Sequence, residues 1–299
     1  MAALCRRIAL LALAATAHGW RLRWADEFDG DTLNASLWRA AANDSEAPPR
    51  WNQVECYMPS NVAVHDGALW LTARLENTTC GRHSGPTYNV TSGKIDSRGL
   101  ANATFPLRIE VRARLQNGWA YGLHSAAWLV GYECDPMTSE IDVFEFEVEP
   151  STNPACANGT FPNAPSCWIR RSANYHYGTQ CGVDLNKIGG GNFPSAPIGT
   201  NPVNFSASFR VFSAEVNATH ALYYDEGENG EEKTLVTSFY KGMPKWPDIV
   251  LPSWDMYVIF SHAYMATPLR RANGPDWIWG ADSLATTHTI DYVRVYGTD

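Results

Sequence analysis

Short runs of β-forming residues, separated by turn residues, follow one another along almost the whole chain. After the first twenty residues, no run of a dozen residues shows the 3.6-residue periodicity of an amphipathic helix. The clearest runs are residues 68–73, 107–115, 126–130, 209–216, 221–224, 257–263 and 289–296. Many short strands with turns between them are typical of an antiparallel sandwich. We therefore predict an all-β fold of two packed, curved antiparallel sheets, one of which offers a concave face.

The N-terminal residues have the pattern of a secretory signal peptide. Two arginines precede an apolar run over residues 8–17, which is too short to span a membrane. Cleavage after Ala17 or Gly19 fits the small residues at the end of this run. We assign residues 1–19 to the signal and residues 20–299 to one domain of about 280 residues. No later apolar stretch suggests a membrane span, so we expect a secreted, extracellular protein.

Cysteine usage agrees with export. One of the seven cysteines leaves with the signal, and the remaining six contain no Cys-x-x-Cys pair, so disulfides are expected rather than a metal site. Six cysteines allow fifteen pairings. We favour Cys156 with Cys167, which would close a loop rich in Pro and Asn. Sequons for N-glycosylation, which also favour a secreted fate, begin at Asn34, Asn43, Asn77, Asn89, Asn102, Asn158, Asn204 and Asn217.

The charge of the chain excludes several partners. The formal charge of −8 becomes −10 when Arg6 and Arg7 leave with the signal. An acidic protein is not expected to bind nucleic acid or an anionic membrane, and an acidic polysaccharide is disfavoured for the same reason. We find neither a linker nor an internal repeat, and we expect a monomer.

Residues 139–147 combine the apolar residue types of a strand with four carboxylates. In a strand of period two, Glu140 and Asp142 share a face, whereas Glu145 would point to the opposite one. One extra residue between Asp142 and Glu145, a β-bulge, would restore the phase and set the three side chains in one row. The sequence therefore predicts a bulged strand with three aligned acids.

Three aligned carboxylates suit the hydrolysis of a glycosidic bond. With the bulge, the backbones at Glu140 and Glu145 would be roughly 13 Å apart, and the side chains could lean together to the ~5–5.5 Å that a retaining mechanism needs. Carboxylates this close hold one pKa up and another down, so that one group protonates a leaving oxygen while the other attacks carbon. The alternative is a solvated strand face, because Glu145, Glu147 and Glu149 also alternate.

Several segments and one motif occur in an order that a known family shares. The segments are residues 22–30 with 37–38, 51–57, 61–62 with 66–73, 91–95, 107–115 and 290–296. The motif Glu-x-Asp-x-x-Glu falls on Glu140, Asp142 and Glu145. Together they resemble glycoside hydrolase family 16, the laminarinase-like enzymes, in its bulged subgroup. The resemblance implies a concanavalin-like β-jelly roll with a concave substrate cleft, Glu140 as nucleophile, Glu145 as acid/base, and Asp142 as the residue that orients and tunes the nucleophile.

The same resemblance suggests residues that contact substrate. His176 lies where the family has a strand histidine near the acid/base, whose charge state it could tune; a packed structural histidine is the alternative. Trp128 is the candidate for a wall on which a sugar ring packs, although buried core Trp is commoner. Asn52 matches a cleft asparagine of the family, and Tyr121 is a further candidate.

The chain departs from the family pattern in the strand before the acidic one. Residues 123–130 are similar to the family's Trp-Pro-Ala-Phe-Trp-Met-Leu strand, but His124 replaces its first Trp and Ser125 its Pro. Loss of this stacking platform implies a changed subsite, in which His124 becomes a candidate substrate-binding residue. The catalytic chemistry is therefore better determined than the specificity.

The resemblance also raises a structural calcium. Several relatives bind one through an acid of the opening strand, a carbonyl near an Asp-Gly turn and the Asp of the closing strand, which correspond to Glu27, Gly67 and Asp291. Oxygen ligands of this kind suit Ca²⁺. A plain salt bridge or a solvated pair is the alternative. No organic cofactor is required.

These observations predict a secreted endo-acting β-glycosidase that hydrolyses O-glycosidic bonds of a polysaccharide with retention of configuration. A β-1,3-glucan or mixed-linkage β-glucan is the leading substrate, and a galactan such as agar or carrageenan is less favoured. A transglycosylase that uses the same residues is one alternative. A glycan-binding protein without turnover is another, and it would be expected to have lost one of the two glutamates.

Overall fold

The computed structural model of the 299-residue chain describes residues 19–42, 55–80, 87–114, 123–132, 139–148, 169–177, 186–188, 192–193, 205, 207–244, 249–252, 254–264 and 285–298. Its regular structure in these ranges is almost entirely β, with one 3₁₀ helix at Pro59–Asn61. The predicted signal segment lies outside the described residues except for Gly19. A search of the described part of the chain finds no helix long and apolar enough to cross a membrane.

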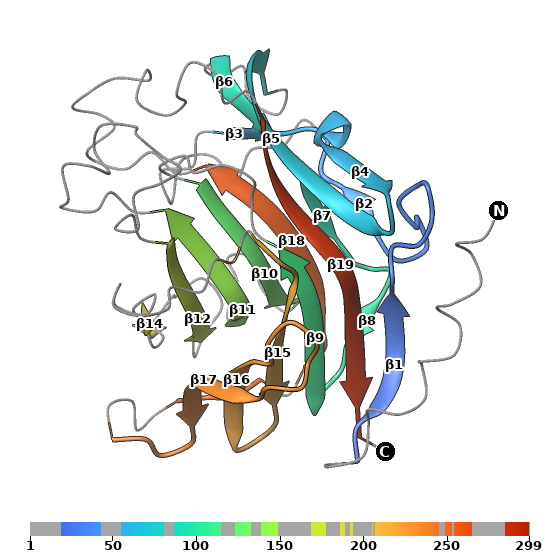
Figure 1. Cartoon of the computed structure of the whole chain (residues 1–299). Helices are drawn as coiled ribbons and strands as arrows, with labels where there is room; N and C mark the ends of the chain where they lie inside the picture. The colour runs from blue at the N-terminus through green and yellow to red at the C-terminus, as the bar shows by residue number, and fades with distance from the viewer. Residues whose placement is uncertain are drawn as a thin grey trace.

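The strands form two sheets that pack as two layers (Figure 1). The first sheet contains, in spatial order, β17 (Thr234–Tyr240), β16 (His220–Asp225), β15 (Arg210–Val216), β9 (Leu107–Arg114), β19 (Ala285–Gly297), β5 (Ala68–Thr79), β6 (Thr87–Ser92) and β3 (Glu55–Tyr57). Two further strands join it, β1 (Arg21–Asp26) beside β19 and β4 (Val62–His65) beside β5.

The second sheet contains, in spatial order, β13 (Asn186–Ile188), β12 (Ile169–Tyr177), β11 (Ser139–Val148), β10 (Leu123–Gly131), β18 (Met256–Tyr264), β7 (Lys94–Asp96) and β2 (Arg39–Ala40). The short strands β14 (Asn192–Phe193) and β8 (Asn102–Ala103) pair with β12 and β18. Among the described strands, pairing is antiparallel except between β3 and β6. Each of the seven runs predicted from the sequence coincides with a strand, except that residue 209 precedes β15 and residue 115 lies outside the described residues. The prediction of an all-β sandwich is confirmed.

The core lies between the two sheets and follows from the alternation along each strand. On β9, Leu107, Ile109 and Val111 are buried in the core, while Arg108 and Glu110 lie on the opposite face. The second sheet contributes aromatic residues from β11 and β18, and these rings pack on rings of the first sheet or of the loops between strands. The inner face of the second sheet therefore packs in the core, and its outer face is available for polar side chains.

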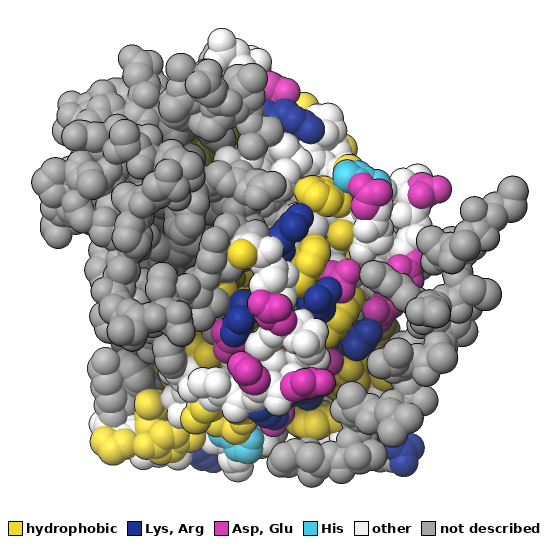
Figure 2. All heavy atoms as spheres, viewed as in Figure 1, with side chains coloured by type: hydrophobic (Ala, Val, Ile, Leu, Met, Phe, Trp, Pro, Cys, Tyr) yellow, Lys and Arg dark blue, Asp and Glu magenta, His cyan; other side chains and the backbone are white. Residues whose placement is uncertain are grey.

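The outer face of the first sheet carries a buried ion network. The Arg108 side chain is only 10% exposed and donates to Glu110 at 2.6 Å and to both Glu215 and Glu226 at 2.7 Å. Lys233 lies 2.5 Å from Glu215 on the other side. Figure 2 shows acidic and basic side chains intermixed on this side of the molecule. Because Glu226 follows β16, the network ties the connection between β16 and β17 to β9.

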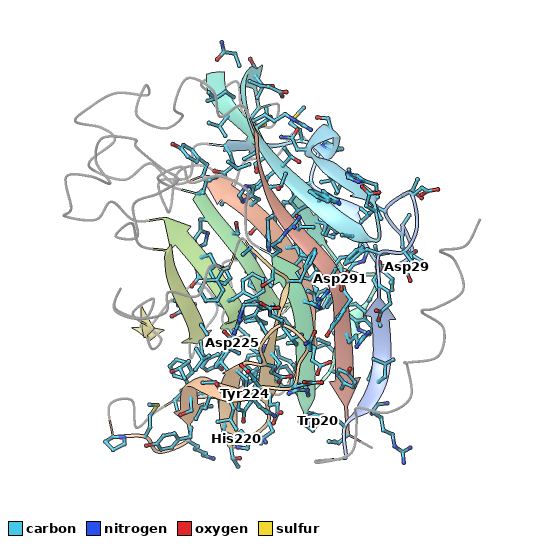
Figure 3. All side chains as sticks on the ribbon, viewed as in Figure 1. Trp20, Asp29, His220, Tyr224, Asp225 and Asp291 are labelled. Atoms are coloured by element: carbon cyan, nitrogen blue, oxygen red, sulfur yellow. A yellow bond between two sulfur atoms is a disulfide. The ribbon has the colours of Figure 1, made fainter. Side chains whose placement is uncertain are left out.

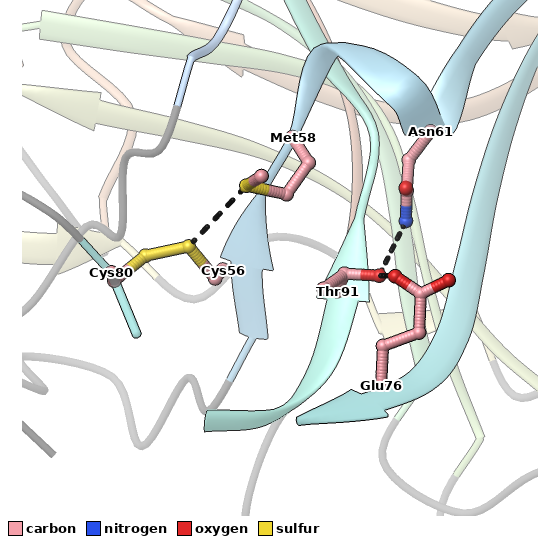
Figure 4. The surroundings of a disulfide bond; sticks show 6 residues. All are labelled: Cys56, Met58, Asn61, Glu76, Cys80 and Thr91. Carbon is pink, nitrogen blue, oxygen red and sulfur yellow. Dashed lines mark hydrogen bonds between the residues drawn. A yellow bond between two sulfur atoms is a disulfide. The ribbon is translucent and has the colours of Figure 1, made fainter. Parts of the chain in front are cut away.

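One disulfide lies at the edge of the first sheet, where Cys56 of β3 is bonded to Cys80 just after β5 (Figure 4). Nearby, the Asn61 amide donates to the Thr91 hydroxyl at 2.9 Å, and Thr91 donates to Glu76 at 2.9 Å. These contacts join β5 to β6 and to the 3₁₀ helix. The favoured pair Cys156–Cys167 lies outside the described residues and stays a prediction.

Candidate active site

The predicted β-bulge is present in β11. Asp142 pairs with Asn174 of β12, and Glu145 pairs with Ser172, so two residues of β11 between these pairs lie opposite one residue of β12. The pairing with β10 shifts at the same place. Val143 and Phe144, two consecutive residues, are both fully buried in the core. Asp142 and Glu145 therefore leave the strand on the same face, the outer face of the second sheet.

His176 of β12 sits against the first two acids. Its Nε2 lies 3.2 Å from Asp142 Oδ2 and 3.8 Å from Glu140 Oε1. Glu140 and His176 are direct cross-strand partners, so this contact is set by the register of β11 on β12. The structure thus places His176 beside Glu140 and Asp142, whereas its position in the sequence predicted a place near Glu145.

Glu145 is held by three donors from the two neighbouring strands. His124 Nε2 of β10 lies 3.0 Å from Glu145 Oε1. The Ser172 hydroxyl donates to Oε2 at 3.1 Å, and the Asn174 amide of β12 donates to the same oxygen. The Tyr223 hydroxyl, from the first sheet, donates to the Asn174 carbonyl at 2.8 Å and so links this strand to the core. The Glu145 carboxylate is fixed in position before any substrate binds.

Burial and neighbouring charge divide the three acids into two groups. Burial raises the pKa of Glu140 well above its ordinary value, and the charge of Asp142 adds to this effect. Burial and the charge of Glu145 likewise raise the pKa of Asp142. Burial acts in the same direction on Glu145, but the hydrogen bond and charge of His124, with help from His176, hold its pKa below the ordinary value. In the empty site, protons favour Glu140 and Asp142, and negative charge favours Glu145.

A solvated strand face does not describe these acids. Asp142 is 2% exposed, and the side chains of Glu140 and Glu145 are 22% and 18% exposed. Carboxylates are rarely buried this far without a partner or a task. That alternative is therefore wrong for the three residues of the row.

The remaining predicted substrate residues divide into described and undescribed ones. Trp128 is the cross-strand partner of Asp142 and is half-buried, with its indole N–H donating to the Ser261 hydroxyl at 3.2 Å. Lys94 Nζ lies over the Trp128 ring, 5.4 Å from its centre, in a cation–π contact. His124 is buried at 7% exposure. Asn52 and Tyr121 lie outside the described residues.

Sequence reasoning missed Ser172 and Asn174 as partners of the acid. The signal was available, because residues two and four positions before His176 share its face of a strand. It was overlooked because a lone Ser or Asn has no distinctive chemistry.

The predicted calcium ligands are engaged in ion pairs. Arg294 donates through two nitrogens to both oxygens of Glu27, at 2.8 and 2.9 Å. Arg112 donates to Asp291 at 2.7 Å, and Asp291 lies on β19 (Figure 3). Gly67 lies in the turn between β4 and β5. Glu27 and Asp291 therefore form plain salt bridges, which was the alternative to calcium binding. Two carboxylates that are already neutralised by arginine do not fit a Ca²⁺ site. The calcium stays a prediction without support from them.

A group with metal-ligand atoms does exist at the acidic row. Ligand atoms of Glu140, Asp142 and His176 lie within 4.8 Å of one another. The same closeness also follows from the pairing of β11 with β12, and it serves proton sharing between carboxylates without any ion.

The comparisons with known proteins agree with this architecture. No family model matches the chain. Glucan endo-1,3-beta-glucosidase A1 of Niallia circulans is 25% identical over 290 residues, which are 93% of this chain and 38% of that protein. The chain therefore spans well under half the length of this curated relative.

Two solved structures have the same fold. The catalytic domain of an endo-1,3-beta-glucanase (laminarinase) from Thermotoga petrophila RKU-1 has a TM-score of 0.68 at 21% identity, with 94% of this chain and 98% of that chain covered. SCLam, a non-specific endo-beta-1,3(4)-glucanase from family GH16, has a TM-score of 0.66 at 21% identity, with 94% and 92% covered. The resemblance to glycoside hydrolase family 16 and its jelly-roll fold, predicted from the sequence, is confirmed.

Proposed function

We propose that the chain is a secreted, retaining endo-β-glycosidase that hydrolyses a β-1,3- or mixed-linkage β-glucan. The observation that carries the proposal is the row of Glu140, Asp142 and Glu145 on one face of a bulged strand. Asp142 is buried, the other two are largely shielded from solvent, and the row is in contact with His124, His176 and the Asn174 amide. The names of the similar proteins, which are endo-1,3-β-glucanases, support the substrate class. The signal-like N-terminus and the sequons support export.

The reaction uses two displacements. Glu140 attacks the anomeric carbon while Glu145 gives its proton to the leaving glycosidic oxygen, so the carbon–oxygen bond breaks and a glycosyl-enzyme forms. Glu145, now ionised, takes a proton from water, and the hydroxide oxygen displaces Glu140 from the carbon. Asp142 and His176 hold Glu140 in place, because His176 contacts both carboxylates.

Two alternatives remain in view. If a sugar hydroxyl replaces water in the second step, the same residues make a transglycosylase, and the affinity of the acceptor site decides between them. A glycan-binding protein without turnover has no need for both glutamates, and both are present, Glu145 within hydrogen-bond distance of His124 and Glu140 3.8 Å from His176. The replacement of a stacking Trp by His124 favours a subsite that differs from that of a standard laminarinase.

A product survey tests the proposal. Purified mature protein is incubated with laminarin, lichenan, agarose and carrageenan, and new reducing ends and oligosaccharides are resolved over time. We expect oligosaccharides from laminarin or lichenan, with the β-anomer formed first by NMR. Longer products than those supplied would identify the transglycosylase, and retention of glycan without new reducing ends would identify the binding protein.

The variant Glu140→Gln tests the nucleophile. We expect kcat to fall on the order of 10⁴-fold or more, because the covalent step is lost, while glycan affinity is kept. Glu228→Gln, the same change in the connection between β16 and β17 of the first sheet, is the control and should leave kcat unchanged. Equal rates in Glu140→Gln and the wild type would remove Glu140 from the mechanism.

A further inference from the structure

The Glu145 carboxylate has almost all of its acceptor capacity occupied in the empty site. An ionised carboxylate offers about four lone-pair positions. Ser172 and Asn174 fill two positions on Oε2, and His124 fills one on Oε1. Counting donors from the described residues only, one position remains, on Oε1, for the proton that the proposed mechanism requires.

The three donors are not equivalent. Ser172 and Asn174 come from β12 and are neutral groups that would hydrogen-bond to either form of the acid. His124 comes from β10, is 7% exposed, and contacts Glu145 diagonally across the strand pair, because Glu145 is directly opposite Ala126. It occupies the position where the resembling strand has a Trp. An indole placed there could not donate to Oε1 in the same way, since its N–H lies on a different part of a larger ring. His124 is thus the donor that distinguishes this chain.

We propose that His124 is a positioning residue that keeps Glu145 ionised in the empty enzyme, so that the catalytic proton rests on the Glu140–Asp142 pair and the reactive arrangement is the minor one. This inference rests on the proposed function. Before reaction, one proton passes from the pair to Glu145. Glu140 then attacks, the leaving oxygen takes that proton, and Glu145 returns to the ionised form that His124 Nε2–H stabilises. No proton is gained or lost in the exchange.

The directions of the pKa shifts agree with this geometry. The groups facing Glu145 are His124 from β10, Asp142 and Glu140 from its own strand, and His176 from β12. The pKa of Glu145 is lowered chiefly by His124, while burial and Asp142 raise the pKa of Glu140.

The neighbouring strand β18 places no competing titratable group opposite His124, because its cross-strand partner there is Ala263. The next residue, His262, is the cross-strand partner of Ser125 and bonds to Ser125 and Thr286 rather than to an acid. Burial lowers the pKa of His262 to about 3, so it stays neutral at working pH.

The test rests on which limb of the pH profile moves. When a protonated acid and an ionised nucleophile are both needed, kcat/KM is bell-shaped. If Glu145 is the ionised member of the free enzyme, the acidic limb reports Glu145 and the basic limb reports the Glu140–Asp142 pair. If Glu145 is instead the protonated member, the assignments are exchanged.

The experiment compares the wild type with His124→Phe, which removes the donor, and His124→Gln, whose amide restores one. His65→Gln on β4, a half-exposed histidine of the first sheet, is the control. Profiles of kcat/KM are measured on the glycan that the wild type hydrolyses. The Glu145 carboxyl carbon is titrated by ¹³C NMR in the same four proteins and assigned with Glu145→Gln.

We expect His124→Phe to move the acidic limb and the Glu145 titration upward by about one pH unit or more, since a hydrogen bond to a charged group is lost. His65→Gln should stay close to the wild type, and His124→Gln, which restores the hydrogen bond but not the charge, should move less than His124→Phe. Movement of the basic limb instead, or an unmoved Glu145 titration, overturns the inference. His124→Asn, whose amide is too short to reach Glu145, gives the same test if the Phe variant does not fold.

The two proposals fail in different ways. A wild type that hydrolyses no glycan overturns the proposed function. A wild type that hydrolyses glycan, with a Glu145 titration that is identical in His124→Phe, overturns only the role of His124.

Discussion

The ion network on the outer face of the first sheet gives a stability prediction whose size follows from the contacts. Arg108→Met removes the guanidinium but keeps much of the apolar stem. It leaves Glu215 and Glu226, whose side chains are 8% and 5% exposed, without their shared partner. Removing one partner of a buried pair costs about 3–5 kcal/mol, because the remaining charge stays buried. Lys233 still contacts Glu215, so we expect the lower half of that range.

The pH dependence gives the prediction its sign. Burial raises the pKa of Glu215, but the Lys233 hydrogen bond and the charges of Arg108 and Lys233 outweigh it, so its pKa in the folded protein lies below the ordinary 4.5. A lowered pKa contributes stability above the unfolded value, and this contribution is lost as pH falls through the folded value. Arg108→Met loses part of this contribution, because one of the two positive charges beside Glu215 is removed. The difference in the free energy of unfolding between wild type and variant should be largest at pH 7 and should shrink below about pH 4.5.

Urea unfolding followed by Trp fluorescence at pH 7 and pH 4 measures this gap. Arg39→Met is the matched control, because Arg39 pairs with Asp96 at 2.7 Å but its side chain is 53% exposed. An exposed pair is worth 0 to about 1 kcal/mol. If Arg108→Met is no less stable than Arg39→Met at pH 7, or if its deficit grows at pH 4, the account of the network as a set of buried, mutually compensated charges is refuted.

Two further predictions concern the edge of the first sheet and are checked by the same unfolding assay. Gly93→Ala should lower the free energy of unfolding by about 1–3 kcal/mol, because its Cβ would lie 2.5 Å from the Asn61 carbonyl oxygen. Gly30→Ala, with its nearest neighbour atom at 3.7 Å, should lose nothing and would contradict the steric reason if it lost as much. Cys80→Ser should lower the free energy of unfolding by roughly 3 kcal/mol, because the Cys56–Cys80 bond closes a 24-residue separation; Cys56→Ser should match it, and the double variant should lose no more.

The strands and the acidic row could be predicted because both depend on local patterns. Alternation on β9 places Ile109 inward and Arg108 outward, and this is visible in the order of the residues. The bulge could be inferred because the phase of Glu145 conflicts with that of Asp142, and one inserted residue is the smallest repair. Nothing beyond ten consecutive residues was needed for either conclusion.

The contacts that tune the site could not be predicted in the same way. His124 and Glu145 are 21 positions apart, and their contact requires the register of β10 on β11. Arg108 meets Glu215 and Glu226 across more than a hundred positions. Register between distant strands is set by the packing of the whole core, so the sequence named His124 as a substrate residue, whereas the structure shows its contact with the acid.

The bulge in β11 allows one strand both to pack its apolar residues in the core and to align its acids on the outer face. Without an extra residue, a strand that buries Ile141 and Val143 would expose Phe144 and bury Glu145, because a shift of one residue exchanges the two faces. With it, Val143 and Phe144 are both buried, and the Phe144 ring packs 4.9 Å from that of Phe212 on the other sheet. The anchored ring fixes the point at which Glu145 leaves the strand. The direction of the acid is therefore determined from the core side, and the donors on the outer face act on a carboxylate already aimed at them.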